Sequence, residues 1–212
     1  MLLSALLLGY PAPLAPVQIL WINLVTDGIV AMPLIAQPAG PDALRVAPVP
    51  LGQRLLHRRL LGRAALMATA MLVSTLGWFV VRSAQGAPFD LVRTEAFTVL
   101  AACQWFNALN CRSPHRSALA FRGASDGWLA LAIALGVTLH AAVLYLPWGG
   151  LLFRTVPVPL ETLLGIVAVA SLVLWAEELR KVVVRLAARR RRPRHEQPSA
   201  HTTTESEGLP AR

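Results

Sequence analysis

Charged residues are scarce in this sequence, and their scarcity argues against an ordinary soluble domain. They make up 15% of the 212 residues, whereas soluble proteins carry about 25%. Hydrophobic residues reach 55%, and the mean hydropathy is +0.54. So large an apolar excess must face something other than water, and lipid is the natural candidate. The composition therefore indicates an integral membrane protein.

Acidic residues are scarcer than basic ones, with 11 against 20. The resulting net charge of +9 could indicate a nucleic-acid partner. However, eight of the basic residues lie between Arg180 and Arg194, directly after an apolar run. A basic cluster beside a membrane span is typical of a cytoplasmic anchor on anionic lipid. We therefore expect the lipid bilayer, and no nucleic acid, as the partner of this charge.

Cysteine is nearly absent, which excludes a disulfide framework. Cys103 and Cys111 are eight residues apart in one predicted helix. That spacing separates them by about 12 Å, too far for a disulfide, so we expect two buried thiols. A secretory signal is not expected either, because the apolar start lacks a preceding basic region and a small-residue cleavage site.

Long apolar runs separated by polar segments predict an all-α fold, a polytopic bundle of membrane helices. The run Leu2–Leu8 is too short to cross a bilayer, and we interpret it as the end of a preceding span. Five further runs are long enough to cross completely. They are Gln18–Ala36, Leu60–Val81, Thr94–Cys111, Gly127–Leu146 and Leu160–Ala176. The segments Ser83–Arg93 and Pro147–Pro159 are predicted to be loops.

Arginine placement predicts the orientation of the bundle. Arginines gather in the segments 45–63 and 112–122 and after the last span, all on one side of the predicted topology. The opposite side holds only Arg82, Arg93 and Arg154. The positive-inside rule therefore places the carboxy terminus in the cytoplasm. We divide the chain into a transmembrane region, residues 1–185, and a basic and then disordered tail, residues 186–212.

Three polar residues inside the first complete span form the strongest candidate site. Asn23, Thr26 and Asp27 are spaced i, i+3, i+4 and share one helix face. Their oxygen atoms suit a hard cation such as Ca²⁺, which takes six to eight oxygen ligands. Gly28 follows directly, and a glycine there would loosen the helix and turn backbone carbonyls toward an ion. The alternative is that the polar side chains are hydrogen-bonding contacts between helices.

Other polar residues in the spans suit structural roles better. Asn107 and Asn110 are expected to bond between helices, while Gln104 is either a neutral ligand or a partner of one. A lone His140 is expected to hydrogen-bond a neighbour. Glu95 is expected to suit the amino terminus of its helix. The charged group Glu177, Glu178, Arg180 and Lys181 is expected to extend toward the membrane surface.

Four segments carry a family resemblance. Pro16–Gly28, PVQILWINLVTDG, resembles the sixth membrane helix of P-type ATPases of the calcium-pump branch. Phe106–Ser113, FNALNCRS, is similar to the eighth helix of that branch, and Leu139–Tyr145, LHAAVLY, to the ninth. Trp175–Lys181, WAEELRK, is similar to the end of the tenth. The matches occur in the family's order and cover nearly the whole chain apart from the tail.

The resemblance implies that Asn23, Thr26 and Asp27 coordinate the transported ion, Ca²⁺ or alternatively Mn²⁺. The eighth helix of the family supplies a glutamate to one site, and Gln104 stands at that position here. A second full ion site is therefore in doubt. The family's ligands on the fourth and fifth helices have no counterpart in this chain. The chain is accordingly expected to hold only part of a site, with the amino-terminal half of the pump as its partner.

The sequence contains no DKTG-type phosphorylation motif, TGES-type loop or GDGxND-type hinge. Phosphoryl transfer needs a positioned nucleophile and metal, so we expect no catalytic residues here, and Mg-ATP to act only in a complete pump. The prediction is a distal transport segment of an ATP-driven divalent cation pump in the cell membrane. Two alternatives stay open. One is a remnant or regulatory small membrane protein that retains the fold, and the other is an independent transporter or channel.

Overall fold

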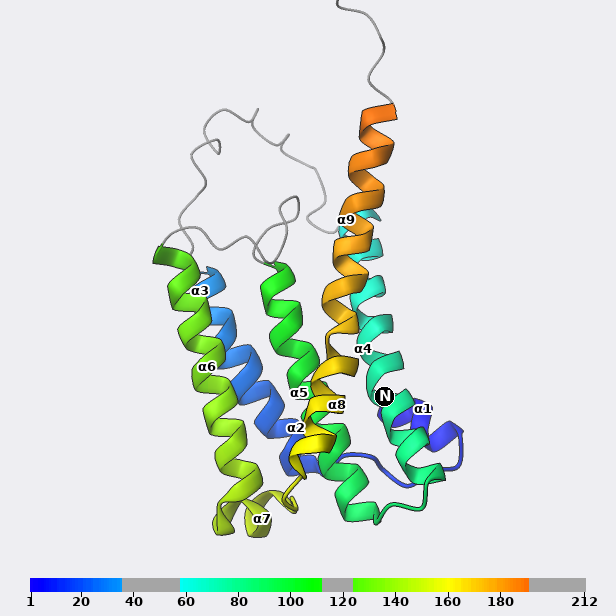
Figure 1. Ribbon diagram of the computed structural model, residues 1–212, viewed down its shortest axis with the longest axis vertical. Helices are drawn as coiled ribbons and strands as arrows, with labels where there is room; N and C mark the ends of the chain where they lie inside the picture. The colour runs from blue at the N-terminus through cyan, green and yellow to red at the C-terminus, as the bar shows by residue number, and fades with distance from the viewer. Residues whose placement is uncertain (36–57, 112–123, 191–212) are drawn as a thin grey trace, which may run out of the picture.

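The computed structural model describes residues 1–35, 58–111 and 124–190, and the described residues are helical with no strand. Long helices stand side by side in one bundle, with α9 reaching beyond the others at one end (Figure 1). The helices are α1 Leu2–Leu7, α2 Pro16–Ile22, η1 Asn23–Ile29, α3 Val30–Ile35, α4 Arg58–Ala84, α5 Phe89–Cys111, α6 Ala124–Tyr145, α7 Pro147–Phe153, α8 Leu160–Ala170 and α9 Leu172–Arg190. The all-α prediction is thereby confirmed.

Four segments are long and apolar enough to cross a membrane. They are Pro16–Ile35, Leu60–Ala84, Gly127–Tyr145 and Leu160–Ala187. The fifth predicted span is present as the helix α5, but it is not among these four, so the count of five stays a prediction. The run at Leu2–Leu7 forms only the six-residue helix α1.

The helix α5 can be more polar than the others because protein surrounds it. It contacts α3, α4, α8, α9 and η1, and Figure 1 shows it in the middle of the bundle. Most of its residues between Val92 and Cys103 are buried. A polar side chain on such a helix can find a partner on a neighbouring helix instead of facing lipid. This position explains why Glu95, Gln104, Asn107 and Asn110 all occur on one helix.

Apolar packing joins α4, α5, α8 and α9 along their length. Met67, Val99, Cys103, Ile166 and Val173 are members of this cluster, and each is at most 6% exposed. A second cluster around Ile22, Phe97 and Phe153 joins α2, α5 and α7. Since lipid is as apolar as these side chains, close packing rather than burial from water favours such contacts.

Three predicted boundaries were wrong. The segment Ser83–Arg93 is not a loop, because α4 continues to Ala84 and α5 begins at Phe89 after a turn in which Gly86 has φ +74°. Asp90 in the first turn of α5 suits the positive end of the helix dipole.

The segment Pro147–Pro159 is not all loop either. It contains α7, which begins with Pro147 at its first position, where a missing N–H costs nothing. The last span, predicted to end at Ala176, is interrupted at Ser171 and continues as α9 to Arg190. The division of the chain at residue 185 stays a prediction. The predicted disordered segment from 191 lies outside the described residues.

The cysteine prediction was half right. Both thiols are free, but only Cys103 is buried, while Cys111 at the last turn of α5 is exposed. Cys111 ends its helix at the rim of the bundle, where fewer neighbours cover it.

Candidate cation site

The predicted site residues lie on a helix whose backbone changes form. The chain from Pro16 to Ile35 passes from α2 through the π-helix η1 and into α3. Asn23, Thr26 and Asp27 all belong to η1, which ends at Ile29. A π-helix has wider turns than an α-helix and is frequent at functional sites. The expected loosening of the helix near Gly28 is therefore present, while the aim of its carbonyls at an ion stays a prediction.

Two residues explain why the α-helix is not maintained here. Gly28 disfavours a regular helix, and a Cβ added to it would meet nothing within 4 Å. Pro33 lies inside α3 and has no N–H to donate to the carbonyl of Ile29, four residues earlier. The carbonyl of Ile29, the last residue of η1, consequently lacks its usual α-helical donor.

One face of η1 packs into the bundle and the other does not. Val25 and the following Val30 are each 3% exposed, and η1 contacts α5 and α6. Asn23 and Gly28 lie on the exposed side. The side chains of Thr26 and Asp27 lie outside the part of the chain that the structure describes. The three predicted ligands thus share one segment, and their convergence on one point is not tested.

Gln104, the second candidate ligand, lies on α5, which contacts η1. Leu100, Gln104 and Asn107 share one face of α5 because they are spaced i, i+4, i+7. Leu100 packs on the cluster that contains Ile22, the residue directly before η1. Gln104 and Asn107 follow on the same face, and both are half-buried. The candidate ligand Gln104 is therefore placed on the face of α5 that leads toward η1.

Three of the six buried polar atoms that lack a hydrogen-bond partner among the described residues belong to α2 and to the middle of α5. Among the described residues, Asn107 Oδ1 and the indole Nε1 atoms of Trp21 and Trp105 are buried without a hydrogen-bond partner. A Cβ built on Gly136 of α6 would lie 3.3 Å from Trp105 Nε1 and 3.9 Å from Val25 of η1. Buried polar groups are nearly always satisfied, so unpaired ones need an explanation such as an ion or water. Within the part of the chain that the structure describes, Asn107 Oδ1 makes no bond between helices, so the expected role of Asn107 stays a prediction.

Two other sequence interpretations are confirmed. Asn110 donates from Nδ2 to the carbonyl of Val173 on α9 at 3.1 Å, which is a bond between helices. His140 Nε2 lies 3.2 Å from Thr98 Oγ1 and packs against the rings of Phe97 and Trp105. Both residues therefore have structural partners.

The two buried acidic residues, Glu95 and Glu177, form ion pairs with arginines. Glu95 is fully buried, and Arg82 of α4 binds it through two bonds of 2.8 and 2.9 Å, with a third from Trp78. Glu177 is also fully buried and pairs with Arg63 and Arg180. The expectation that Glu177 and Lys181 extend to the surface was wrong, since both are buried by α4 and α5.

Among the described residues, no group of three or more His, Cys, Asp and Glu side chains could hold a metal. The ion pairs of Glu95 and Glu177 could not be found from the sequence, because Arg82 and Arg63 belong to a different helix than the carboxylates they bind. The segment η1 and the adjoining face of α5 remain the candidate cation site.

The segment that carries the candidate site is similar to parts of known cation-transporting ATPases. Residues 11–183, which include η1 and α5, match the family model described as "Cation transporting ATPase, C-terminus". The chain is 30% identical to Calcium-transporting ATPase 1 of Yarrowia lipolytica, over 84% of this chain and 19% of that protein. It is 34% identical to Calcium-transporting ATPase type 2C member 2 of Mus musculus, over 85% of this chain and 19% of that protein.

Endoplasmic reticulum calcium ATPase srcA of Aspergillus fumigatus is 31% identical, over 84% of this chain and 22% of that protein. The chain thus spans about a fifth of the length of these curated relatives. Its helices apolar enough to cross a membrane agree with a membrane domain of such a protein. This chain belongs to the C-terminal membrane family of cation-transporting P-type ATPases.

Proposed function

We propose that this chain is the distal transport segment of an ATP-driven pump for Ca²⁺, or alternatively Mn²⁺. The observation that carries the proposal is the π-helix η1, which bears Asn23, Thr26 and Asp27 in the middle of a membrane-spanning helix. The names of the relatives, which are calcium-transporting ATPases, support the choice of ion.

In this proposal the site combines side-chain and backbone oxygens. Asp27 supplies the negative charge that offsets the dehydration of a divalent cation, while Asn23 and Thr26 add neutral oxygens. The loosened carbonyls of η1 contribute further ligands, as broken helices do in transporters. Gln104 is a candidate neutral ligand from α5.

A complete coordination shell of six to eight oxygens needs ligands from elsewhere in the pump. Asn23 lies on the exposed side of η1, so it is open to a neighbouring part of a longer protein. Phosphorylation with Mg-ATP would occur in that other part and would switch the site between two states. We further propose that the pump lies in the cell membrane with its carboxy terminus in the cytoplasm, because the basic residues gather at that end.

The test is ion uptake into vesicles by the complete pump that contains this segment, at matched expression. Asp27→Asn keeps the shape and one oxygen but removes the charge, so we expect transport of Ca²⁺ to be lost. The low dielectric of the bundle makes one charge matter far more than it does in water. Asn107→Ala, on the adjoining face of α5, is the comparison, and we expect it to be milder because it removes a neutral amide and no charge.

Normal transport by Asp27→Asn together with loss in Asn107→Ala would place the ion on a different helix. Absence of transport in every variant, the parent included, would favour a remnant or regulatory protein that retains the fold.

A further inference from the structure

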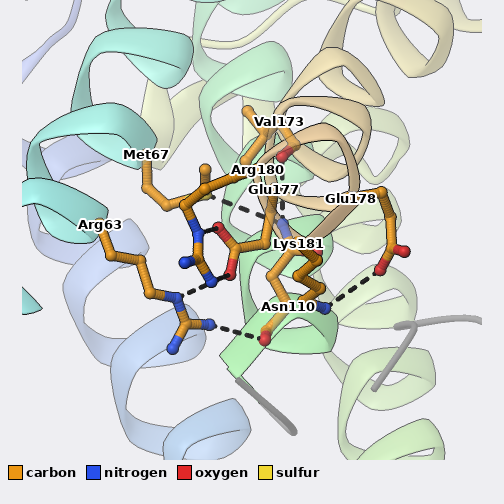
Figure 2. Close-up of polar contacts among 8 residues, drawn as sticks. All are labelled: Arg63, Met67, Asn110, Val173, Glu177, Glu178, Arg180 and Lys181. Atoms are coloured by element: carbon orange, nitrogen blue, oxygen red, sulfur yellow. Dashed lines mark hydrogen bonds and ion pairs between the residues drawn. The ribbon is translucent and has the colours of Figure 1, made fainter. Parts of the chain in front are cut away.

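A cluster of charges joins three helices at the end of the bundle where α9 projects (Figure 1). Glu177 of α9 accepts from Arg180 Nε and Nη2, both at 2.7 Å, and from Arg63 Nε of α4 at 2.8 Å. Arg63 Nη2 also donates to the carbonyl of Asn110 at 2.8 Å. Asn110 is the second-last residue of α5, so this arginine satisfies a carbonyl in the last turn of that helix. Figure 2 shows these side chains converging on one carboxylate.

This cluster holds more positive than negative charge. Two guanidinium groups share the single carboxylate of Glu177, while Lys181 is paired with Glu178 at 3.0 Å. The cluster at the other end of α4 differs, since Glu95 there has one arginine, Arg82, and the pair is neutral. The cluster around Glu177 therefore keeps a positive charge that its own carboxylate does not neutralise, and this charge favours an anion.

The depth of the two clusters matches the two surfaces of a bilayer. Arg63 and Arg82 are 19 residues apart in the helix α4, which corresponds to about 28 Å. The hydrocarbon core of a bilayer is about 30 Å thick. The backbone of Arg63 therefore lies near one edge of the hydrocarbon core when the bundle spans a membrane, and Arg180, which binds the same carboxylate, lies at the same level. From there a long arginine side chain reaches the headgroup layer.

The surface beside this cluster is apolar and unpaired with protein. On α9, Trp175 is 58% exposed and Leu179 is 66% exposed, and both lie within five residues of Arg180. On α4, Leu60 and Leu61 are exposed within three residues of Arg63. Arg63 and Arg180 keep 18% and 26% of their side chains accessible. Arginine side chains that reach the headgroup layer beside an exposed apolar strip are complementary to a phospholipid, which carries a phosphate and acyl chains.

We propose that Arg63 and Arg180 form a binding site for the phosphate of an anionic phospholipid, whose acyl chains lie along Leu179 and Trp175. Glu177 holds both guanidinium groups in place, and their Nη1 groups are left for the lipid phosphate, since neither has an acceptor among the described residues. Arginine suits this role because its planar fork binds phosphate at two points. The inference requires only that the bundle spans a membrane and does not depend on which ion is transported.

The experiment measures lipid retention by the purified chain in nanodiscs, using fluorescent phosphatidylglycerol and phosphatidylcholine of equal chain length. We expect the chain to prefer phosphatidylglycerol, and Arg180→Gln to lower that preference about five-fold, as expected for one basic residue at an anionic surface. This variant leaves Glu177 paired with Arg63, so the fold is expected to persist, which circular dichroism and gel filtration check.

Arg154→Gln is the matched control, because Arg154 is an exposed arginine after α7, at the opposite end of the bundle. Arg154→Gln should lower the preference clearly less than Arg180→Gln does, because Arg154 belongs to no arginine cluster, whereas Arg180→Lys should retain part of it. Equal retention of the two lipids by the parent, or equal losses in Arg180→Gln and Arg154→Gln, would overturn the proposal. Displacement of the lipid by an equal concentration of inorganic phosphate would also overturn it, since the site would then bind free anions.

Discussion

Two buried carboxylates, Glu95 and Glu177, connect helices at opposite ends of this bundle. Each binds an arginine of α4 at 2.8 Å. Neither contact could be predicted from the sequence, because Arg63 and Glu177 are on helices far apart in the chain. Glu177 and Arg180 are three residues apart, a spacing that occurs both on exposed helix faces and on buried ones. Spacing alone therefore cannot show that Glu177 is buried, which follows from the packing of α9 against α4 and α5.

The substitution Glu95→Gln should destabilise the bundle. It removes the charge that receives two bonds from Arg82 and leaves that arginine with a neutral amide. We expect a loss of about 2 kcal/mol in the free energy of unfolding, below the value for a fully buried pair because Arg82 is 25% exposed. Denaturant unfolding in mild detergent measures it. The exposed carboxylate of Glu161 supplies the control Glu161→Gln, and equal losses in the two variants would contradict the assigned role of Glu95.

At the scale of elements, apolar length predicted α4 and α6 well. Both ends of each helix fall within three residues of the predicted spans. Hydropathy says less about α5, because its environment is protein and its polar residues are accommodated there. The short helix α7 was not predicted, since seven residues with two glycines have no apolar period to detect.

The π-helix η1 illustrates what sequence reasoning can reach at a candidate site. Gly28 indicated that the helix would loosen, and it does. The π-helical form could not be predicted, because Gly28 and Pro33 indicate only that the helix is weakened, while the packing of Val25 and Val30 inside the bundle is known only from the structure. Whether Asn23, Thr26 and Asp27 bind a cation together stays a prediction.

The contact between α7 and the end of α6 depends on one glycine. A Cβ at Gly149 would lie 2.1 Å from the backbone oxygen of Val143. The clash is with the backbone, so it cannot be removed by a change of side-chain rotamer. Gly149→Ala should therefore lower the free energy of unfolding by about 1–3 kcal/mol. Gly77→Ala in α4 is the control, because nothing lies within 4 Å of its added Cβ. Alanine favours a helix over glycine, so this control should be neutral or stabilising. Similar effects of the two substitutions on thermal unfolding would contradict the close packing of α7.

At the scale of the whole molecule, this chain corresponds to about a fifth of its relatives' length. The motifs that phosphorylate a P-type ATPase are absent from its 212 residues. We therefore expect the purified chain alone to release no phosphate from ATP at any divalent cation concentration, because phosphoryl transfer needs a nucleophile and metal that it does not supply. A phosphate-release assay on a clean preparation tests this expectation. Cation-stimulated hydrolysis that persists through further purification would contradict it.

The orientation of the bundle gives the last prediction. The end of α9 and the start of α4 lie at one end of the molecule, and the turn between α4 and α5 lies at the other (Figure 1). Eight lysine and arginine residues follow Glu178, beginning at Arg180 and ending at Arg194. Because basic segments beside a span stay on the cytoplasmic side, a reporter fused after Arg194 should be active in the cytoplasm. The same reporter inserted at Gly86, where φ +74° marks the turn between α4 and α5, should be translocated. Translocation of the Arg194 fusion with a cytoplasmic Gly86 insertion would reverse every span, and it would also place the Arg63 and Arg180 cluster at the outer surface of the membrane.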